Sequence, residues 1–526
     1  MIPVGTMARC PYCLASNPDS SSICYSCGRV ILGAGGMAMR LEPSIPGGNR
    51  VHGARRGPPP GLNVRRGGKR REKKKKSNLR SMVLVIAVAF LFLFTPAQER
   101  ISTQLEKWLD TLLDEFGPAR EYPVHATYTV ERNVHLINPH SQPITFSYEL
   151  PIPEVRTDFG NSEYGFESMD GTFSYPVVTL QEVVSMVAKV EGGANQVMIP
   201  ISEEYIGADD AIALDMNSEI FWPPVGQNNE RCSVGRCAIW QGEIETGQMA
   251  TLEVTYDVIS TSFSWWGSSK APEKAPRAAD EISIHSGNDG TYDDYNRAGR
   301  LDSMYDQFGS EKQWYDRDPG PSQNWAVDGT SNVVVALADE IESSLNPDDV
   351  NSPYAFAHAS FIKIRDSIVY SQGLSPARGG PACIVDERGD CDEQSNAWMS
   401  LLRTRNIPAW YEFGPMTDSQ FSAWEPHAWS NAIFPLDEQW CMEKNIDLTT
   451  CFVEGEVDVV NNRWLLHTPT TMTEWIEQPS YLGEDSYEFY RPLSIGCVNC
   501  WAESWETIGE PEILGGNYRV PVRIGE

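Results

Sequence analysis

One cysteine of the chain stands where it could act as a nucleophile. Cys391 lies between two aspartates in GDCDEQSNAW, immediately before an apolar helical pattern. Asp390 is a good N-cap, which predicts that a helix begins at Cys391 and that the sulfur lies at the positive end of the helix dipole. Backbone N–H groups at a helix start lower the pKa of a thiol, but Asp392 and Glu393 oppose this effect. A partner base is therefore required.

His427 is the candidate for that base. It stands in EPHAWSNAIF, where a short polar turn leads into an alternating run that predicts a β-strand. A cysteine at a helix start and a histidine on a neighbouring strand form an activated thiol, in which the imidazole takes the proton and later returns it to a leaving group. Two alternatives stay open: a purely structural histidine, and a disulfide between Cys383 and Cys391.

The N-terminal region carries a cysteine pattern of different chemistry. Cys10, Cys13, Cys24 and Cys27 are spaced as C-x2-C, ten residues, C-x2-C. Two such turns can close a tetrahedral thiolate shell around Zn(II), similar to a zinc ribbon. We expect a structural zinc in residues 8–32, because so short a module could hardly fold without metal. Two disulfides are the alternative, which a reducing cytosol disfavours.

An apolar run separates two parts of the chain. Residues 82–94 are 13 consecutive apolar side chains, preceded by the basic sequence RRGGKRREKKKK. Because Lys/Arg-rich flanks stay on the cytoplasmic side of a membrane helix, we expect a single-pass transmembrane helix at 81–97. The N-terminus would be cytoplasmic and the main domains would lie outside the cell membrane. A buried core helix and a cleaved signal peptide are the alternatives.

The charge distribution is consistent with two different surroundings. The net charge is −30, yet residues 1–81 carry 16 Lys and Arg against 3 Asp and Glu, while the other 445 residues carry 26 against 69. The basic flank is expected to contact anionic lipid headgroups, and the acidic remainder argues against nucleic-acid binding. Residues 33–80 lack an apolar period, which predicts a disordered basic tether. The zinc ribbon on this tether would bind a cytoplasmic protein partner.

Four further segments follow the span. An i, i+4, i+7, i+8 apolar pattern predicts an amphipathic stalk helix at 98–118. Alternating runs separated by Pro, Gly and Asn predict an antiparallel β-sandwich at 119–262. Residues 263–324 are expected to be a polar linker, and mixed helix and strand patterns fill a domain at 325–526 with a C-terminal extension. The fold class is therefore α+β and multidomain.

Eight cysteines lie beyond the span, where the compartment permits disulfides. Their proximity in sequence suggests the pairs Cys232–Cys237, Cys441–Cys451 and Cys497–Cys500. A second metal site built from the last four of these cysteines is the alternative.

Three motifs of the last domain resemble the transglutaminase-like superfamily. They are RGDCDEQSNAWMSLLRTRNIPAWYEFG, HAWSNAIF and RWLLHTPTT. In that superfamily a Gly-(Asp/His)-Cys nucleophile opens a helix, Arg-x-x-Gly-Ile-Pro-Ala follows, His-Ala-Trp lies on a strand, and Trp-x-x-Asp-x-Thr lies on the next. Asn406 stands where the family has glycine, and asparagine also tolerates a positive φ. The resemblance covers about residues 325–475 and implies a papain-like core.

The resemblance implies a catalytic set of Cys391, His427 and His467. His467 aligns with the family's aspartate, which orients the imidazole. A neutral imidazole can hold the tautomer of His427, but it cannot offset the charge of an imidazolium as a carboxylate does. Asp447 is the rival orienting residue, in a loop that a Cys441–Cys451 disulfide would close.

The resemblance also implies cysteine acyl transfer on amide bonds of a protein or peptide substrate. Cys391 would form a thioester, with its own backbone N–H in the oxyanion hole. An amine would then give a cross-link, or water would give hydrolysis. No catalytic cofactor is implied. The intact Cys391 and His427 favour an acyltransferase or peptidase, whereas a histidine in place of the aspartate favours a catalytically degenerate scaffold or binding protein.

Overall fold

The computed structural model describes most of the chain beyond residue 118, with gaps. The described residues are 7–9, 16–18, 119–153, 155–157, 178–201, 208–223, 236–265, 284–285, 287–297, 326–371, 379–477, 493–495 and 500–521. Near the N-terminus they form a short hairpin of β1 (Met7–Arg9) and β2 (Ser16–Pro18). The zinc-ribbon cysteines, the tether, the expected span at 81–97 and the stalk helix lie outside the described residues. Within the described ranges, no helix is long and apolar enough to cross a membrane.

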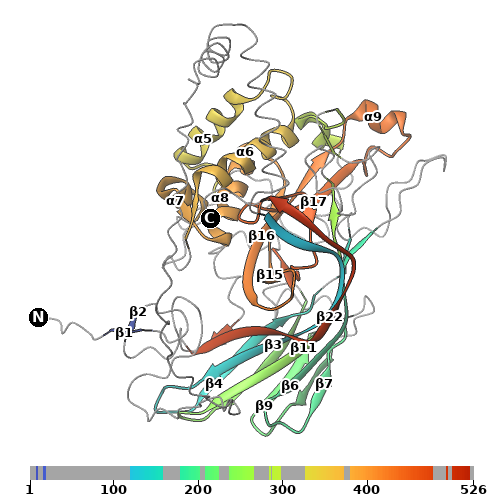
Figure 1. Ribbon diagram of the computed structural model, residues 1–526. Helices are drawn as coiled ribbons and strands as arrows, with labels where there is room; N and C mark the ends of the chain where they lie inside the picture. Colours follow the sequence, from blue (N-terminus) through green and yellow to red (C-terminus); the bar gives the residue numbers. More distant parts are fainter. Residues whose placement is uncertain are drawn as a thin grey trace, which may run out of the picture. The chain divides into compact units, whose positions relative to one another are not determined.

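Two antiparallel sheets pack on one apolar core in the first large domain (Figure 1). The strand orders are β22-β3-β11-β6-β5, with β7 paired to β6, and β21-β4-β10-β9-β8. The first sheet contains β3 (Ala119–Ile137), β5 (Arg156–Thr157), β6 (Thr179–Val190), β7 (Gln196–Met198), β11 (Met249–Thr261) and β22 (Trp501–Pro521). The second contains β4 (Ile144–Pro151), β8 (Ala208–Ala213), β9 (Ser218–Trp222), β10 (Cys237–Ile244) and β21 (Leu493–Ile495). Burial alternates along β3, as the period of two in a strand requires.

The C-terminal strands belong to this sandwich. β22 pairs with β3 from Trp501 opposite Leu136 to Pro521 opposite Ala119, and β21 pairs with β4. The sequence predicts that these residues are a C-terminal extension of the domain at 325–526, whereas in the structure β21 and β22 are strands of the sandwich. A strand as long as β3 presents an edge of unpaired backbone groups, and β22 satisfies that edge. The residues between β11 and β21 are thus an insertion into the sandwich.

A mixed helix and sheet domain forms most of that insertion. Its sheet has the order β18-β17-β16-β15-β20. The strands are β15 (Ala409–Thr417), β16 (Trp424–Pro435), β17 (Phe452–Asp458), β18 (Arg463–Trp464) and β20 (Trp475–Ile476). The helices are α5 (Asn332–Ser344), α6 (Pro353–Ser367), α7 (Gly380–Asp386), α8 (Cys391–Arg403) and α9 (Glu438–Glu443). The expected mixed α+β class is confirmed.

Helix α8 is the centre of this domain. It packs against α5, α6 and α7 and against the strands β15 and β16 (Figure 1). The sequence pattern predicted one buried face, but α8 is buried from Glu393 to Arg403, including Asn396 and Ser400. The polar residues are tolerated because some of them bond to backbone, as Ser400 does to the carbonyl of Asn396.

Part of the expected linker is structured. β12 (Phe263–Ser264) pairs with β19 (Leu466–His467) of the inserted domain. Further along, Tyr295 donates a hydrogen bond to the carbonyl of Ile433, and Ile284 belongs to the inserted domain's apolar core. The expectation of a polar linker over 263–324 is therefore wrong for these described residues. Their aromatic and apolar side chains pack against the inserted domain.

The disulfide between Cys441 and Cys451 is present, as predicted. Their sulfurs are therefore not free to bind the alternative metal. Cys237 and Cys500 are also disulfide-bonded, and the predicted partners Cys232 and Cys497 lie outside the described residues.

Candidate active site

Cys391 is the first residue of α8, as the sequence predicts. Asp390 and Glu393 form a capping box, in which the Asp390 side chain accepts from the backbone of Glu393 and the Glu393 carboxylate accepts from the Asp390 N–H at 3.2 Å. Gly389 is needed before them, because a Cβ at this position would lie 2.6 Å from the Cys383 sulfur. The Gly-Asp-Cys sequence thus fixes where the helix begins and where the sulfur lies.

Neither Cys383 nor Cys391 forms a disulfide. The disulfide that would have blocked the nucleophile is absent from the structure. Cys383 is fully buried beneath Gly389, whereas Cys391 is partly exposed. Of the two cysteines, Cys391 is therefore the more exposed residue.

His427 lies on β16, the strand that α8 packs against. The backbone N–H of Ala428, the residue after His427, approaches the Cys391 sulfur closely enough to lower the pKa of the thiol. His427 is 4% exposed, and its Nε2 lies 2.8 Å from a carboxylate oxygen of Asp458. Within the described residues, Nδ1 makes no hydrogen bond and the sulfur does not bond the ring directly. Because a carboxylate only accepts, Nε2 carries the hydrogen and Nδ1 is the basic nitrogen.

Asp458 is the residue that orients His427. It is buried at the end of β17 and also accepts from Arg463 Nε at 3.1 Å. The backbone N–H of Asn461 donates to its other oxygen at 3.1 Å, and the Asn461 amide donates at 2.6 Å. Burial alone would raise the pKa of this carboxyl, but the charges of His427 and Arg463 outweigh burial and hold it well below its usual range. Asp458 is therefore ionised in the folded protein.

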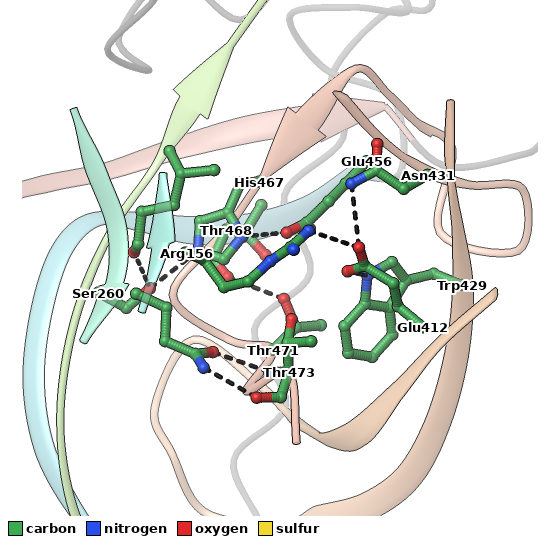
Figure 2. Close-up of polar contacts among 12 residues, drawn as sticks. Arg156, Ser260, Glu412, Trp429, Asn431, Glu456, His467, Thr468, Thr471 and Thr473 are labelled. Atoms are coloured by element: carbon green, nitrogen blue, oxygen red, sulfur yellow. Dashed lines mark hydrogen bonds and ion pairs between the residues drawn. The ribbon is translucent and has the colours of Figure 1, made fainter. Parts of the chain in front are cut away.

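His467 is not the partner of His427. Its Nδ1 lies 2.6 Å from Glu456 and its Nε2 lies 3.0 Å from the Ser260 hydroxyl, as Figure 2 shows. The rival Asp447 is exposed and accepts hydrogen bonds from Thr449 in its own turn. The structure therefore pairs His427 with Asp458, and not with His467 as the resemblance implied.

The strand pairing explains this outcome. β16 and β17 are antiparallel, with Ser430 opposite Val457, so Asp458 follows directly on the strand that neighbours His427. His467 comes after a further turn and lies on β19, which pairs with β12. Three acids alternate in FVEGEVD and so share one face of the strand, but this pattern alone indicates a face exposed to solvent. The structure instead buries all seven residues of β17, so the sequence gives no signal for the role of Asp458.

The electrostatics keep the resting sulfur protonated. Burial, followed by the charges of Asp392 and Asp390, raises the pKa of the Cys391 thiol well above its usual value. The backbone N–H of Ala428 opposes this shift without reversing it. Burial, together with Asp392 and Glu393, also raises the pKa of Asp390 to about 9. The imidazole must therefore remove the thiol proton when the sulfur reacts.

A buried polar network supports the strand that carries His427. Glu412 of β15 accepts from Trp429 Nε1 at 3.1 Å and from the Asn431 amide at 3.0 Å. The ring of Trp429 stacks against that of His427, with centroids 5.8 Å apart. Arg156, from the sandwich, forms an ion pair with the same Glu412 carboxylate (Figure 2). Burial raises the pKa of Glu412, and the Arg156 charge opposes this.

Three residues near the site, Trp398, Arg403 and Asn406, have structural roles. Trp398 is fully buried and donates to the Ala357 carbonyl at 3.1 Å. Arg403 donates to the Ala409 carbonyl at 2.7 Å and so closes the turn after α8. Asn406 has φ of 54°, the positive value expected at the family's glycine position. Over the described ranges, no group of three or more His, Cys, Asp or Glu could hold a metal ion.

Comparisons with known proteins identify the domain that carries this site. Residues 339–442, which include Cys391 and His427, match the family model described as the Transglutaminase-like superfamily. The fold and the site thus define a mixed α+β, strand-rich protein with a transglutaminase-like domain. Asp458 lies beyond the matched residues.

Two solved structures are similar over much of the chain. A candidate cysteine protease from Cytophaga hutchinsonii has 11% identity and a TM-score of 0.36, covering 75% of this chain and 93% of its own. A candidate protease from Parabacteroides distasonis has 10% identity and a TM-score of 0.16, covering 57% of this chain and 62% of its own. No curated protein matches the sequence.

Proposed function

We propose that the protein is a cysteine acyltransferase or peptidase that acts on amide bonds of a protein or peptide substrate. Cys391 is the nucleophile, His427 is the general base and then the general acid, and Asp458 orients His427. The observation that carries the proposal is the 2.8 Å hydrogen bond between the buried His427 and Asp458, on a strand that packs against the helix that Cys391 opens.

The reaction starts with a neutral thiol. Nδ1 of His427 takes the thiol proton as the sulfur attacks the amide carbonyl, and the ionised Asp458 stabilises the imidazolium that forms. The backbone N–H of Cys391, at the start of α8, stabilises the charge that develops on the carbonyl oxygen. The imidazolium then protonates the leaving amine, and a thioester remains on Cys391.

The thioester is resolved by the reverse sequence. His427 removes a proton from water or from an incoming amine, which attacks the thioester carbonyl. The sulfur leaves and regains its proton from the imidazolium. Water as acceptor gives hydrolysis, whereas an amine gives a new amide bond, as in a cross-link.

Alkylation of Cys391 by iodoacetamide tests this proposal without a known substrate. Peptide mapping at neutral pH should show Cys391 modified faster than Cys383, which is the internal control because it is buried. His427→Ala should slow the modification of Cys391 roughly a hundredfold, since the general base is lost. Equal rates in the two proteins would overturn the proposed role of His427.

A catalytically degenerate scaffold is the second candidate. The observation that favours it is the raised pKa of the Cys391 thiol. The absence of an orienting carboxylate, which the sequence suggested, no longer supports it because Asp458 occupies that place. An unreactive Cys391 in the alkylation experiment would favour the scaffold.

We also propose the topology that the sequence indicates. A membrane helix at 81–97 anchors the protein, the N-terminus is cytoplasmic, and Cys10, Cys13, Cys24 and Cys27 hold a structural Zn(II) in a module that binds a cytoplasmic protein. The supports are the C-x2-C pairs and the basic flank of the apolar run. In intact cells, a tag before residue 80 should resist added protease and one after 120 should be cleaved. Purified protein should contain one zinc per chain, lost in Cys10→Ser.

A further inference from the structure

A two-stranded ribbon of the sandwich reaches into the inserted domain. We call it the terminal ribbon, and it consists of residues 119–123 of β3 paired with residues 517–521 of β22. A register shift separates it from the rest of the sheet, at Gly515 and Gly516, which have φ of 77° and 75°. Such a bulge changes the direction of a strand, and Figure 1 shows β22 bending along its length.

The terminal ribbon is attached to the turn that follows Asp458. Tyr122 and Tyr518 pack with Leu466 of the inserted domain in a small apolar cluster. The Arg463 guanidinium lies 5.9 Å from the centre of the Tyr122 ring. Tyr518 is fixed in turn by a 2.8 Å hydrogen bond between its hydroxyl and Ser262. The ribbon therefore contacts one of the two residues that share the Asp458 carboxylate with His427.

Arg120 of the terminal ribbon contacts the other. Its guanidinium donates to the side-chain oxygen of Asn461, and the Asn461 nitrogen donates to Asp458 at 2.6 Å. The same nitrogen lies 3.1 Å from Nε2 of His427. Arg120 thus lies two hydrogen bonds from the carboxylate that orients the catalytic imidazole.

Arg120 and Asp458 together require one orientation of the Asn461 amide. A guanidinium can only donate, so Arg120 requires the oxygen of the Asn461 amide to face it. The amide nitrogen must then face Asp458, which can only accept. Without Arg120, only the contacts with Asp458 and His427 orient the Asn461 amide. Arg463 donates to the same oxygen of Asp458 as His427 does, and the Asn461 amide is a further donor that helps to place this carboxylate.

We propose that Arg120 is a positioning residue for the His427–Asp458 pair and acts through the orientation of Asn461. The inference rests on the proposed function, because it assigns Arg120 a role in activating Cys391. It also means that the inserted domain is incomplete as a catalytic unit without the terminal ribbon.

The test uses the full-length protein and the rate of Cys391 alkylation by iodoacetamide as a function of pH. Arg120→Met keeps the aliphatic stem and removes the donor. It should slow alkylation about tenfold at neutral pH and move the half-maximal pH upward, since a displaced imidazole takes the thiol proton less readily. Arg120→Lys should restore part of the rate, because an ammonium also donates.

Arg519→Ala is the matched control. Arg519 lies on the same ribbon opposite Glu121, and its side chain is exposed. This variant should alkylate as the wild type does. Asn461→Ala should reproduce the Arg120→Met defect, and the double variant should be no slower than the slower single variant, because the two residues act in series. Thermal unfolding of each variant shows whether the fold is kept.

Three outcomes separate the proposals. If Arg120→Met reacts as Arg519→Ala does while His427→Ala is slow, the role of Arg120 is wrong and the proposed function stands. Additive losses in the double variant would also contradict action through Asn461. If His427→Ala reacts as the wild type does, the proposed function itself fails.

Discussion

At the scale of single residues, the site depends on which carboxylate meets the histidine. Asp458 is ionised because His427, Arg463 and Asn461 all donate to it, and burial makes each of these bonds strong. His467 and Glu456 form a second buried pair that serves packing between the two domains, through Ser260. The two pairs lie on alternate residues of β17 and should respond differently to mutation.

Asp458→Asn and His467→Gln test this difference. Asp458→Asn should slow Cys391 alkylation on the order of a hundredfold, because an amide cannot stabilise the imidazolium. His467→Gln should leave the alkylation rate near the wild-type value. It should instead lower the free energy of unfolding by about 3 kcal/mol, since Glu456 would stay buried without the hydrogen bond from its partner. Loss of alkylation in His467→Gln with an intact fold would restore His467 to the catalytic set.

The raised pKa of Asp390 predicts a pH dependence of stability. Its folded value of about 9 lies above the ordinary 3.8, so the folded state binds this proton more tightly. The stabilisation is fully present below pH 4 and is lost as the pH rises toward 9. Asp390→Asn keeps a good N-cap and removes the titrating group. The melting temperature of Asp390→Asn, relative to that of the wild type, should therefore increase as the pH rises from 5 to 9. A difference that stays constant over this range would contradict the raised pKa of Asp390.

At the scale of elements, the segment around Met472 packs closely on β15, the strand that pairs with His427 of β16. Gly414 of β15 lies opposite His427 on β16, and a Cβ at this position would meet the Met472 carbonyl oxygen at 1.7 Å. The segment around Met472 therefore passes over β15 closely enough that only glycine fits. Met472 and Glu474 both donate backbone hydrogen bonds to β15 there.

Gly414→Ala should displace this crossing segment. We expect the free energy of unfolding to fall by about 3 kcal/mol, in the upper range for overpacking, because the obstacle is backbone. Alkylation of Cys391 should slow as well, since β15 and β16 move together. Gly247→Ala is the comparison, because a Cβ there meets nothing within 4 Å and only the positive φ is strained. An unchanged melting temperature in Gly414→Ala would show that the crossing is looser than described.

The elements predicted from the sequence fared unevenly. Helix α8, its start at Cys391 and the strand with His427 follow from local signals, namely an N-cap and a period of two. The burial of α8 on all sides was not predictable, because its polar residues lose their solvent only when α5, α6 and α7 pack around it. Asp458 was missed for a related reason, since a carboxylate at a strand end has meaning only beside its neighbouring strand.

At the scale of the whole molecule, the catalytic domain is an insertion into the sandwich. β22 returns along the full length of β3, and Arg132 of β3 bonds both Glu474 of the inserted domain and Glu503 of β22 at 2.8 Å. The strands β3 and β22 of the sandwich thus both contact the inserted domain. In β3, Arg120 bonds Asn461, which in turn bonds Asp458.

Deletion of the residues after Glu477 tests this organisation. The truncated chain should lose the cooperative unfolding of the sandwich, because the edge of β3 and the apolar face under Trp505 are exposed. Limited proteolysis should then cleave β3, which is protected in the full chain. An intact sandwich in the truncated protein would indicate that the C-terminal strands are an extension after all.

Local chemistry in the sequence by itself determined the start of the helix at Cys391, the strand that carries His427 and the strand-rich sandwich pattern, because N-caps, periodicity and short motifs act between near neighbours. Tertiary structure decided the orienting carboxylate, the return of the C-terminal strand and the reach of Arg120 to Asn461. The contact of Asp458 with His427 joins residues 31 positions apart, that of Arg120 with Asn461 joins residues 341 positions apart, and the C-terminal strand pairs with residues still more distant in the chain. No local pattern encodes such pairs, since their partners are selected only when the sheets and the inserted domain pack together.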